Sequence, residues 1–303
     1  MKMIKKSEIM ADLNQFLRHY YAETLEKAGF VPCEDRMFDW YKAENDLLYG
    51  VHFPIHGPTS PFIYLETGIS VVPLFVWDEI PMRMPINDNY WGHSGDRFLG
   101  MLTEHRKYLD LIERKIGPLK KKSYTKPALI DGLPCGRNLH ILNSERRGAE
   151  VLDDIALPLL SSIKSVEDIY HFNLEYRCAV NGFDTLDQYL KYITKEKQKY
   201  GTREDFSIAL ADECVAVRDE KMYPYMIDSL EAIYKRCMEG LEPDAPWAKR
   251  NHKYYLLESE RSALLIRVMR EKDYALWEES IAIEREKMLQ QIRNKLPQLQ
   301  IVT

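Results

Sequence analysis

Among the residues of this 303-residue chain, the histidines His52 and His56 are our first candidates for metal or acid–base chemistry. They are four residues apart, and on a continuous strand this spacing puts both side chains on one face. A metal ion would need a further ligand such as Glu66 or His93, and Pro54 interrupts a regular strand between the histidines. We therefore predict no metal site and no cofactor, and we keep His52 and Glu66 as candidate binding residues.

A loop rich in aromatic and ionisable residues is the second candidate. The segment 87–97 contains Tyr90, Trp91, His93, Asp96 and Arg97. Such mixtures are typical of loops that meet a ligand or a protein partner. The alternative is that the two aromatic residues pin the loop to a sheet and that Asp96 caps the helix that follows.

Familiar catalytic and phosphate-binding motifs are missing from the sequence. It contains no GxSxG, no GxxxxGK[ST] and no GxGxxG. The cysteines are odd in number and never in CxxC spacing: Cys33, Cys135, Cys178, Cys214 and Cys237. This pattern argues against a disulfide framework or a zinc ribbon, so we expect small buried thiols and a reducing, cytoplasmic setting.

The bulk composition excludes several classes of partner. A formal net charge of -5 provides no general attraction to a polyanion, so we expect no nucleic-acid partner. No apolar run of about 18 residues is present, so we expect no membrane span. Charged residues also interrupt the N-terminal segment where a signal peptide would need an apolar core.

Local patterns predict helices in the N-terminal half. Ser7 is the expected N-cap of an amphipathic helix, and Gly29 ends that helix in a left-handed conformation. A second helix is predicted over 98–116, where hydrophobic periodicity returns, and Gly117 stops it.

Strands are predicted between these helices. The segments 37–42 and 47–55 are rich in aromatic and aliphatic residues and flank the polar cluster 44–46, which predicts an antiparallel hairpin. A third strand is expected from 62 to about 75, with Gly68 at a bulge.

Beyond Gly148 nearly all of the sequence has helical periodicity. Two capping boxes mark predicted helix starts, Ser165 with Asp168 and Thr202 with Asp205. The last hundred residues predict two antiparallel helix pairs, 203–217 with 223–239 and 252–270 with 273–295. The second pair has a tetratricopeptide-like look at 263–265 and 273–277. Plain helical packing is the alternative, since a true array repeats about every 34 residues.

A resemblance covers about a third of the chain. Its residues are Gly29-Phe30, the hairpin residues Phe38, Trp40 and Tyr41, the strand residues Tyr64, Glu66, Gly68 and Ile69, and the later segments 154–160 and 165–168. Together they resemble an uncharacterised bacterial domain-of-unknown-function family that begins with a helix, a GF turn and a β-meander, and that has a later Leu-Pro helix. The resemblance implies an α+β domain with a helical C-terminal part and no activity. The segment 78–137 is longer here than the equivalent link.

We therefore expect an α+β fold in which an antiparallel β-meander packs with helices over 1–147 and an α-helical region follows over 148–303. The predicted function is a non-enzymatic binding or regulatory module that contacts a protein partner through the helical region. The alternative is a hydrolase-like or other acid–base enzyme. Its pocket would lie between the sheet and the 87–97 loop, with His52, Glu66, His93 or Asp96 transferring protons. The sequence leaves the oligomeric state open, and self-association through the helical region is a third hypothesis.

Overall fold

The computed structural model describes residues 6–33, 39–53, 55–56, 63–65, 68–75, 106–118, 128–130, 152–242 and 248–301. The chain divides into two compact units. Unit 1 comprises Met1–Val72, Ile86–Lys164 and Gln290–Thr303, and unit 2 comprises Pro73–Pro85 and Ser165–Leu289. The sequence predicts a single division at 147/148, whereas the two units found here are not contiguous in sequence. Unit 2 includes Pro73–Pro85, and the end of the chain, Gln290–Thr303, belongs to unit 1.

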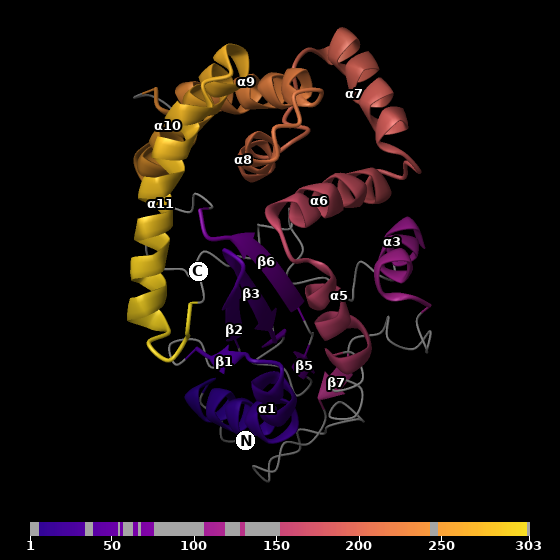
Figure 1. Ribbon diagram of the computed structural model, residues 1–303, viewed down its shortest axis with the longest axis vertical. Helices are drawn as coiled ribbons and strands as arrows, with labels where there is room; N and C mark the ends of the chain where they lie inside the picture. Colours follow the sequence, from indigo (N-terminus) through magenta and orange to yellow (C-terminus); the bar gives the residue numbers. More distant parts are fainter. Residues whose placement is uncertain are drawn as a thin grey trace. The chain divides into compact units, whose positions relative to one another are not determined.

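The described strands of the chain form two sheets (Figure 1). The strands are β1 Val31–Pro32, β2 Asp39–Glu44, β3 Leu47–His52, β4 Ile55–His56, β5 Ile63–Leu65, β6 Gly68–Pro73 and β7 Ala128–Ile130. One sheet has the order β1-β2-β3-β6 and the other has the order β4-β5-β7. The helices pair in the C-terminal part, so the predicted α+β class is confirmed.

The predicted hairpin is formed by β2 and β3. Asn45 and Asp46 have φ angles of 54° and 58°, as a two-residue turn of the primed type requires. The turn sets an antiparallel register in which Glu44 faces Leu47 and Asp39 faces His52. Alternation along the strands then puts Asp39 and His52 on the same face of the sheet.

The third predicted strand, 62–75, is two strands that belong to different sheets. β5 pairs with β4 and β7, whereas β6 is a neighbour of β3. The same division separates the two histidines, because His52 ends β3 and His56 lies in β4. The two histidines thus lie on separate strands on either side of Pro54, so the condition for a shared face, one continuous strand, is not met.

Helix α1, Lys6–Lys27, ends as predicted. Gly29 has a φ of 85°, and the amide of Phe30 donates to the carbonyl of Leu25 at 2.9 Å. This closure satisfies carbonyls at the helix end that lack a helical partner. The turn also starts the chain toward β1.

Three further helical segments belong to unit 1: α3 Arg106–Ile116, the π-helical turn η3 Leu152–Ala156, and α5 Leu157–Ser162. The predicted stop of α3 is confirmed, since Gly117 follows with a φ of 87°. The Tyr49 hydroxyl on β3 donates to the carbonyl of Ile163 at 2.9 Å, which links the hairpin to the segment after α5. The Gln298 side chain donates to the carbonyl of Pro32, so the end of the chain contacts β1.

Unit 2 consists mainly of helices. They are α6 Val166–Val180, α7 Leu186–Tyr200, α8 Ile208–Ala216, α9 Tyr223–Gly240, α10 Ala248–Glu271 and α11 Tyr274–Lys295, the last of which ends in unit 1. Ser165 caps α6 by accepting from the amide of Asp168, as predicted. The predicted start at Thr202 is wrong: Ser207 caps α8 instead, accepting from the amide of Leu210.

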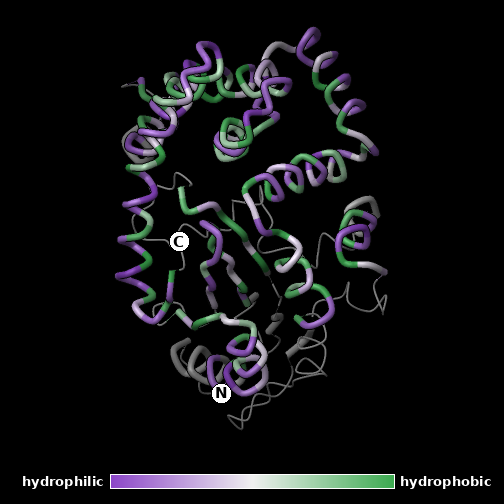
Figure 2. Tube along the Cα trace, in the orientation of Figure 1, coloured by the Kyte–Doolittle hydropathy of each residue, from purple (hydrophilic) through white to green (hydrophobic). Residues whose placement is uncertain are grey.

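Apolar and polar residues alternate along α9 and α10 (Figure 2). On α9 the buried residues Met226, Leu230, Ile233 and Cys237 recur at helical spacing and mark the inward face. These two helices make the most extensive helix contact among the described residues, although the sequence assigns them to different pairs. A methyl group on Gly240 would lie 2.7 Å from the Tyr255 ring, so this close contact of α9 with α10 requires a residue without a side chain.

A buried ion pair joins three helices of unit 2. Arg261 on α10 donates through two nitrogen atoms to the carboxylate of Asp212 on α8, with Nε 3.1 Å from Oδ2. Trp277 on α11 donates its indole N–H to the same carboxylate at 3.0 Å, and Arg261 also donates to Ser280 at 2.9 Å. The Asp212 and Arg261 side chains are 1% and 5% exposed, so the pair has almost no contact with water.

We expect Arg261→Met to lower the free energy of unfolding by about 3–5 kcal/mol, because it leaves the Asp212 charge buried without its cation. Urea denaturation followed by circular dichroism measures the change. Arg267→Met on the same helix is the matched control: Arg267 pairs with Glu271 at an exposed site, where such pairs contribute about 0.3–0.5 kcal/mol. Equal losses for the two variants would contradict the expectation.

Candidate functional site

His52 lies in a chain of hydrogen bonds on one face of the four-stranded sheet. Its Nδ1 is 2.9 Å from Oδ1 of Asp39, and its Nε2 is 2.8 Å from Oγ of Ser70. Asp39 is on β2, directly opposite His52, and Ser70 is on β6. The chain of bonds therefore crosses three neighbouring strands.

Backbone and aromatic groups support this arrangement. The Tyr41 hydroxyl donates to Oδ2 of Asp39 at 3.3 Å, and the Tyr41 ring meets the His52 ring edge-on with centroids 5.8 Å apart. Gly50 lies beneath the His52–Ser70 bond: a methyl group there would be 2.5 Å from Oγ of Ser70 and 2.6 Å from Nε2 of His52. Only glycine at this position leaves room for the bond.

The connectivity of Asp39, His52 and Ser70 is that of a Ser-His-Asp triad. In such a triad the carboxylate accepts from Nδ1–H of the histidine, and Nε2 accepts the hydroxyl proton of the serine. Ser70 is only 3% exposed and lies within a strand, however, whereas a nucleophile must reach its substrate. The geometry orders the sheet and gives the hydroxyl little access to a substrate.

His52 is the candidate site residue whose surroundings the structure describes. The other candidates, Glu66, Tyr90, Trp91, His93, Asp96 and Arg97, lie outside the described residues. The partners of His52 were missed at the sequence level. Asp39 could have been found from the hairpin, because a two-residue turn at 45–46 places it opposite His52, but Ser70 has no such local signal.

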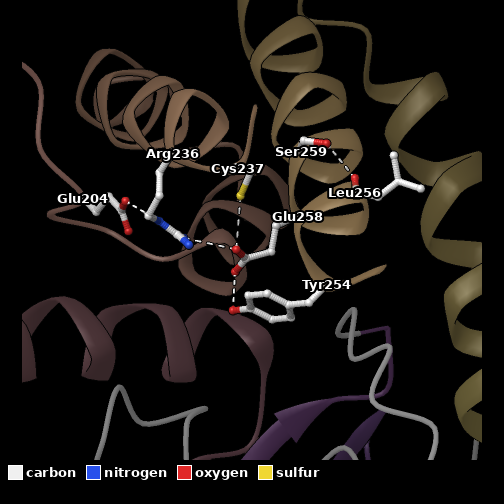
Figure 3. Close-up of polar contacts among 7 residues, drawn as sticks. All are labelled: Glu204, Arg236, Cys237, Tyr254, Leu256, Glu258 and Ser259. Carbon is white, nitrogen blue, oxygen red and sulfur yellow. Dashed lines mark hydrogen bonds and ion pairs between the residues drawn. The ribbon is translucent and has the colours of Figure 1, made fainter. Parts of the chain in front are cut away.

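A second polar cluster lies between α9 and α10 in unit 2 (Figure 3). The carboxylate of Glu258 accepts from the Arg236 guanidinium at 3.1 Å, the Cys237 thiol at 3.3 Å and the Tyr254 hydroxyl at 2.5 Å. Arg236 also donates to Glu204 at 2.6 Å. Since Glu258 is buried and Arg236 is half-exposed, the cluster extends from the helix interface to the surface.

The cysteines within the described residues are buried thiols: Cys33, Cys178, Cys214 and Cys237. Burial, together with the nearby Glu258 carboxylate, raises the pKa of the Cys237 thiol to about 12. Burial likewise raises the pKa of Cys214 to about 12 and that of Cys178 to about 11. The thiolate is the nucleophilic form, so these groups are inert at neutral pH. For these four residues the expectation of buried thiols is confirmed, and Cys135 lies outside the described residues.

Glu213, the residue after Asp212, is a fully buried carboxyl group on α8. Asn173 on α6 donates its side-chain amide to both carboxyl oxygens, at 3.0 and 3.3 Å. Burial raises the pKa of Glu213 well above its ordinary value, because the charged form loses its hydration.

The described His, Cys, Asp and Glu side chains include no group of three or more that could hold a metal ion. No helix within the described ranges is both long enough and apolar enough to cross a bilayer. Comparison with protein-family models, curated proteins and solved structures finds no match to this chain. The resemblance to an uncharacterised bacterial family therefore stays a prediction, and the site must be interpreted from its own geometry.

The raised pKa of Glu213 gives the stability of the fold a defined pH dependence. The folded state holds this proton more tightly than the unfolded chain, whose carboxyl group has a pKa of about 4.3. The contribution of this proton to the free energy of unfolding is fully present below the unfolded-state pKa. It is lost as the pH rises toward the pKa of Glu213 in the folded state. We expect Glu213→Gln to remove this loss, so the difference in Tm, variant minus wild type, should increase from about pH 5 to about pH 8.

Thermal unfolding across that range measures the difference. Glu239→Gln is the control, because Glu239 is exposed on α9 and lies 3.9 Å from Lys235. A Tm difference that is constant with pH for Glu213→Gln would show that the carboxyl group is ionised in the folded state.

Proposed function

We propose that this chain is a non-enzymatic binding or regulatory module whose helical unit 2 contacts a protein partner. The observation that carries the proposal is a set of large apolar side chains that the described helices of unit 2 expose. They are Tyr192, Tyr200, Tyr234, Met238, Tyr254, Leu256 and Ile283. Among the described residues of unit 1, Tyr20 on α1 is similarly exposed.

The residue types favour recognition. Tyrosine and methionine are enriched at protein interfaces, where aromatic rings bury a large area at a small cost in side-chain entropy. Tyr234 and Met238 are one turn apart on α9 and therefore share a face of the helix.

Five of these seven residues, those on α9, α10 and α11, lie on helices that buried polar contacts join. The buried contacts of Asp212 and Glu258 connect α8, α9, α10 and α11. A surface on such helices loses little conformational entropy when a partner binds, which favours affinity. Free buried thiols also fit a reducing compartment, so we place the module in the cytoplasm.

We expect Tyr234→Ala/Met238→Ala to reduce capture of the partner by about tenfold, since buried aromatic anchors dominate interface energies. The full chain serves as bait in extracts of the cell that makes it, with quantitative mass spectrometry as the readout. Tyr20→Ala in unit 1 is the matched control, because it removes an equally exposed tyrosine and should leave capture unchanged. If both variants and the wild type retain the same proteins, the proposed surface is wrong.

A hydrolase-like acid–base enzyme is the alternative, and the Asp39–His52–Ser70 connectivity is the observation that favours it. In that case Oγ of Ser70 would attack an ester carbonyl while Nε2 of His52 takes the hydroxyl proton. The burial of Ser70 opposes this chemistry.

A fluorophosphonate probe separates the two functions. Labelling would form a bond from Oγ of Ser70 to phosphorus and release fluoride, with the proton passing to His52. We expect no label on Ser70 and no difference in 4-nitrophenyl acetate hydrolysis between wild type and Ser70→Ala. Stoichiometric labelling of Ser70 that His52→Ala abolishes would contradict the non-enzymatic proposal.

A further inference from the structure

Helix α7 carries a row of lysines on the face that points away from the core of unit 2. Tyr189 and Ile193 are buried and mark the inward face of the helix. Lys191, Lys195 and Lys199 follow one another at intervals of four residues, and all three are exposed. Residues at this spacing lie along one side of a helix. These three residues are the lysine row.

Many basic side chains of unit 2 are paired with carboxylates: Lys197 with Asp228, Arg203 with Glu196, Arg236 with Glu204, Arg270 with Glu231 and Lys272 with Glu220. Lys221 and Lys253 have no ion pair with a described residue, so it is the regular spacing along one side of a helix that distinguishes the lysine row. Lys191, Lys195 and Lys199 form no ion pair with a described residue. No carboxylate in the described part of the chain therefore pairs with these three ammonium groups, although the net charge of the whole chain is -5.

Exposed tyrosines border the row. Tyr192 packs against the Phe183 ring with centroids 5.1 Å apart, so its ring is held in place. The Tyr200 ring lies 4.5 Å from Nζ of Lys199 and is 63% exposed. Aromatic rings beside unpaired cations combine apolar contact area with charge, as the anchor residues of interfaces do.

We propose that the lysine row binds an acidic helical segment of the protein partner; this inference rests on the proposed function of unit 2 and names its ligand chemistry. Lys191 and Lys199, the ends of the row, are eight residue steps apart, or about 12 Å at the helical rise. A partner helix with carboxylates at i, i+4 and i+8 presents charges at the same spacing. Opposite charges at this spacing favour encounter and set the register of the two helices.

Other polyanions fit the row less well. A membrane-surface helix inserts an apolar face into the bilayer, but the apolar face of α7 is buried in unit 2. Double-stranded nucleic acid carries one charge about every 1.7 Å and would be repelled by the net charge of the chain. An acidic helix needs only three carboxylates at the spacing of the three lysines.

The test uses the full chain and a fluorescein-labelled helical peptide of about 20 residues with glutamate at every fourth position. Fluorescence anisotropy should show binding that weakens as salt increases, and a peptide with glutamine in place of glutamate should not bind. We expect Lys191→Glu/Lys195→Glu/Lys199→Glu to weaken binding by about tenfold or more. Lys221→Glu/Lys235→Glu/Lys253→Glu makes the same change of net charge elsewhere in unit 2 and should have a smaller effect.

Three results would overturn the inference. The first is an equal loss for the two triple variants, which would mean that only net charge matters. The others are equally tight, row-dependent binding of a single-stranded oligothymidylate or of phosphatidylserine vesicles.

Partner capture distinguishes this inference from the proposed function. A native partner that Tyr234→Ala/Met238→Ala loses but the α7 triple variant retains would contradict the role of the lysine row and leave the binding function standing. Row-dependent binding of the peptide without capture of any native protein would support the row and contradict the proposed function.

Discussion

The burial of the Asp212–Arg261 ion pair is the constraint on which unit 2 depends. Removing two charges from water costs several kcal/mol for each ion, and only good geometry with further hydrogen bonds offsets that cost. Trp277 and Ser280 supply those bonds from α11, so α8, α10 and α11 must keep one relative position. The next residue, Glu213, bonds to Asn173 on α6. Asp212 and Glu213 on α8 therefore contact different helices: Asp212 contacts α10 and α11, and Glu213 contacts α6.

In unit 1, too, buried polar groups are paired with one another. Asp39, His52 and Ser70 are mostly buried polar groups, and each satisfies the next across three strands. The bond between His52 and Ser70 requires glycine at position 50, because a side chain there would occupy the space that the two bonded atoms fill. This geometry looks catalytic when its bonds are drawn alone. Because the groups are mostly buried, the bonds are better explained as the hydrogen-bond partners that a buried histidine needs.

These internal networks direct attention to the surface of unit 2. Burial raises the pKa of the Glu213 carboxyl group and of the Cys214 and Cys237 thiols, which disfavours their charged forms. On the outside of the unit, exposed tyrosines lie on α7, α9 and α10. Alongside the tyrosines of α7 lies the lysine row. A rigid scaffold with apolar and cationic groups outside, and neutralised polar groups inside, is suited to recognition.

The sequence by itself determined the features that depend on neighbours along the chain. These include the glycine stop of α1, the cap at Ser165, and a hairpin whose turn already implies that Asp39 faces His52. Tertiary structure decided the rest: the separation of His52 from His56, the partner of α9, and the meeting of Asp212 with Arg261. Caps and turns are local because their hydrogen bonds span only a few residues. Buried polar contacts are not local, since the groups that neutralise a charge come from whichever distant segments packing brings together.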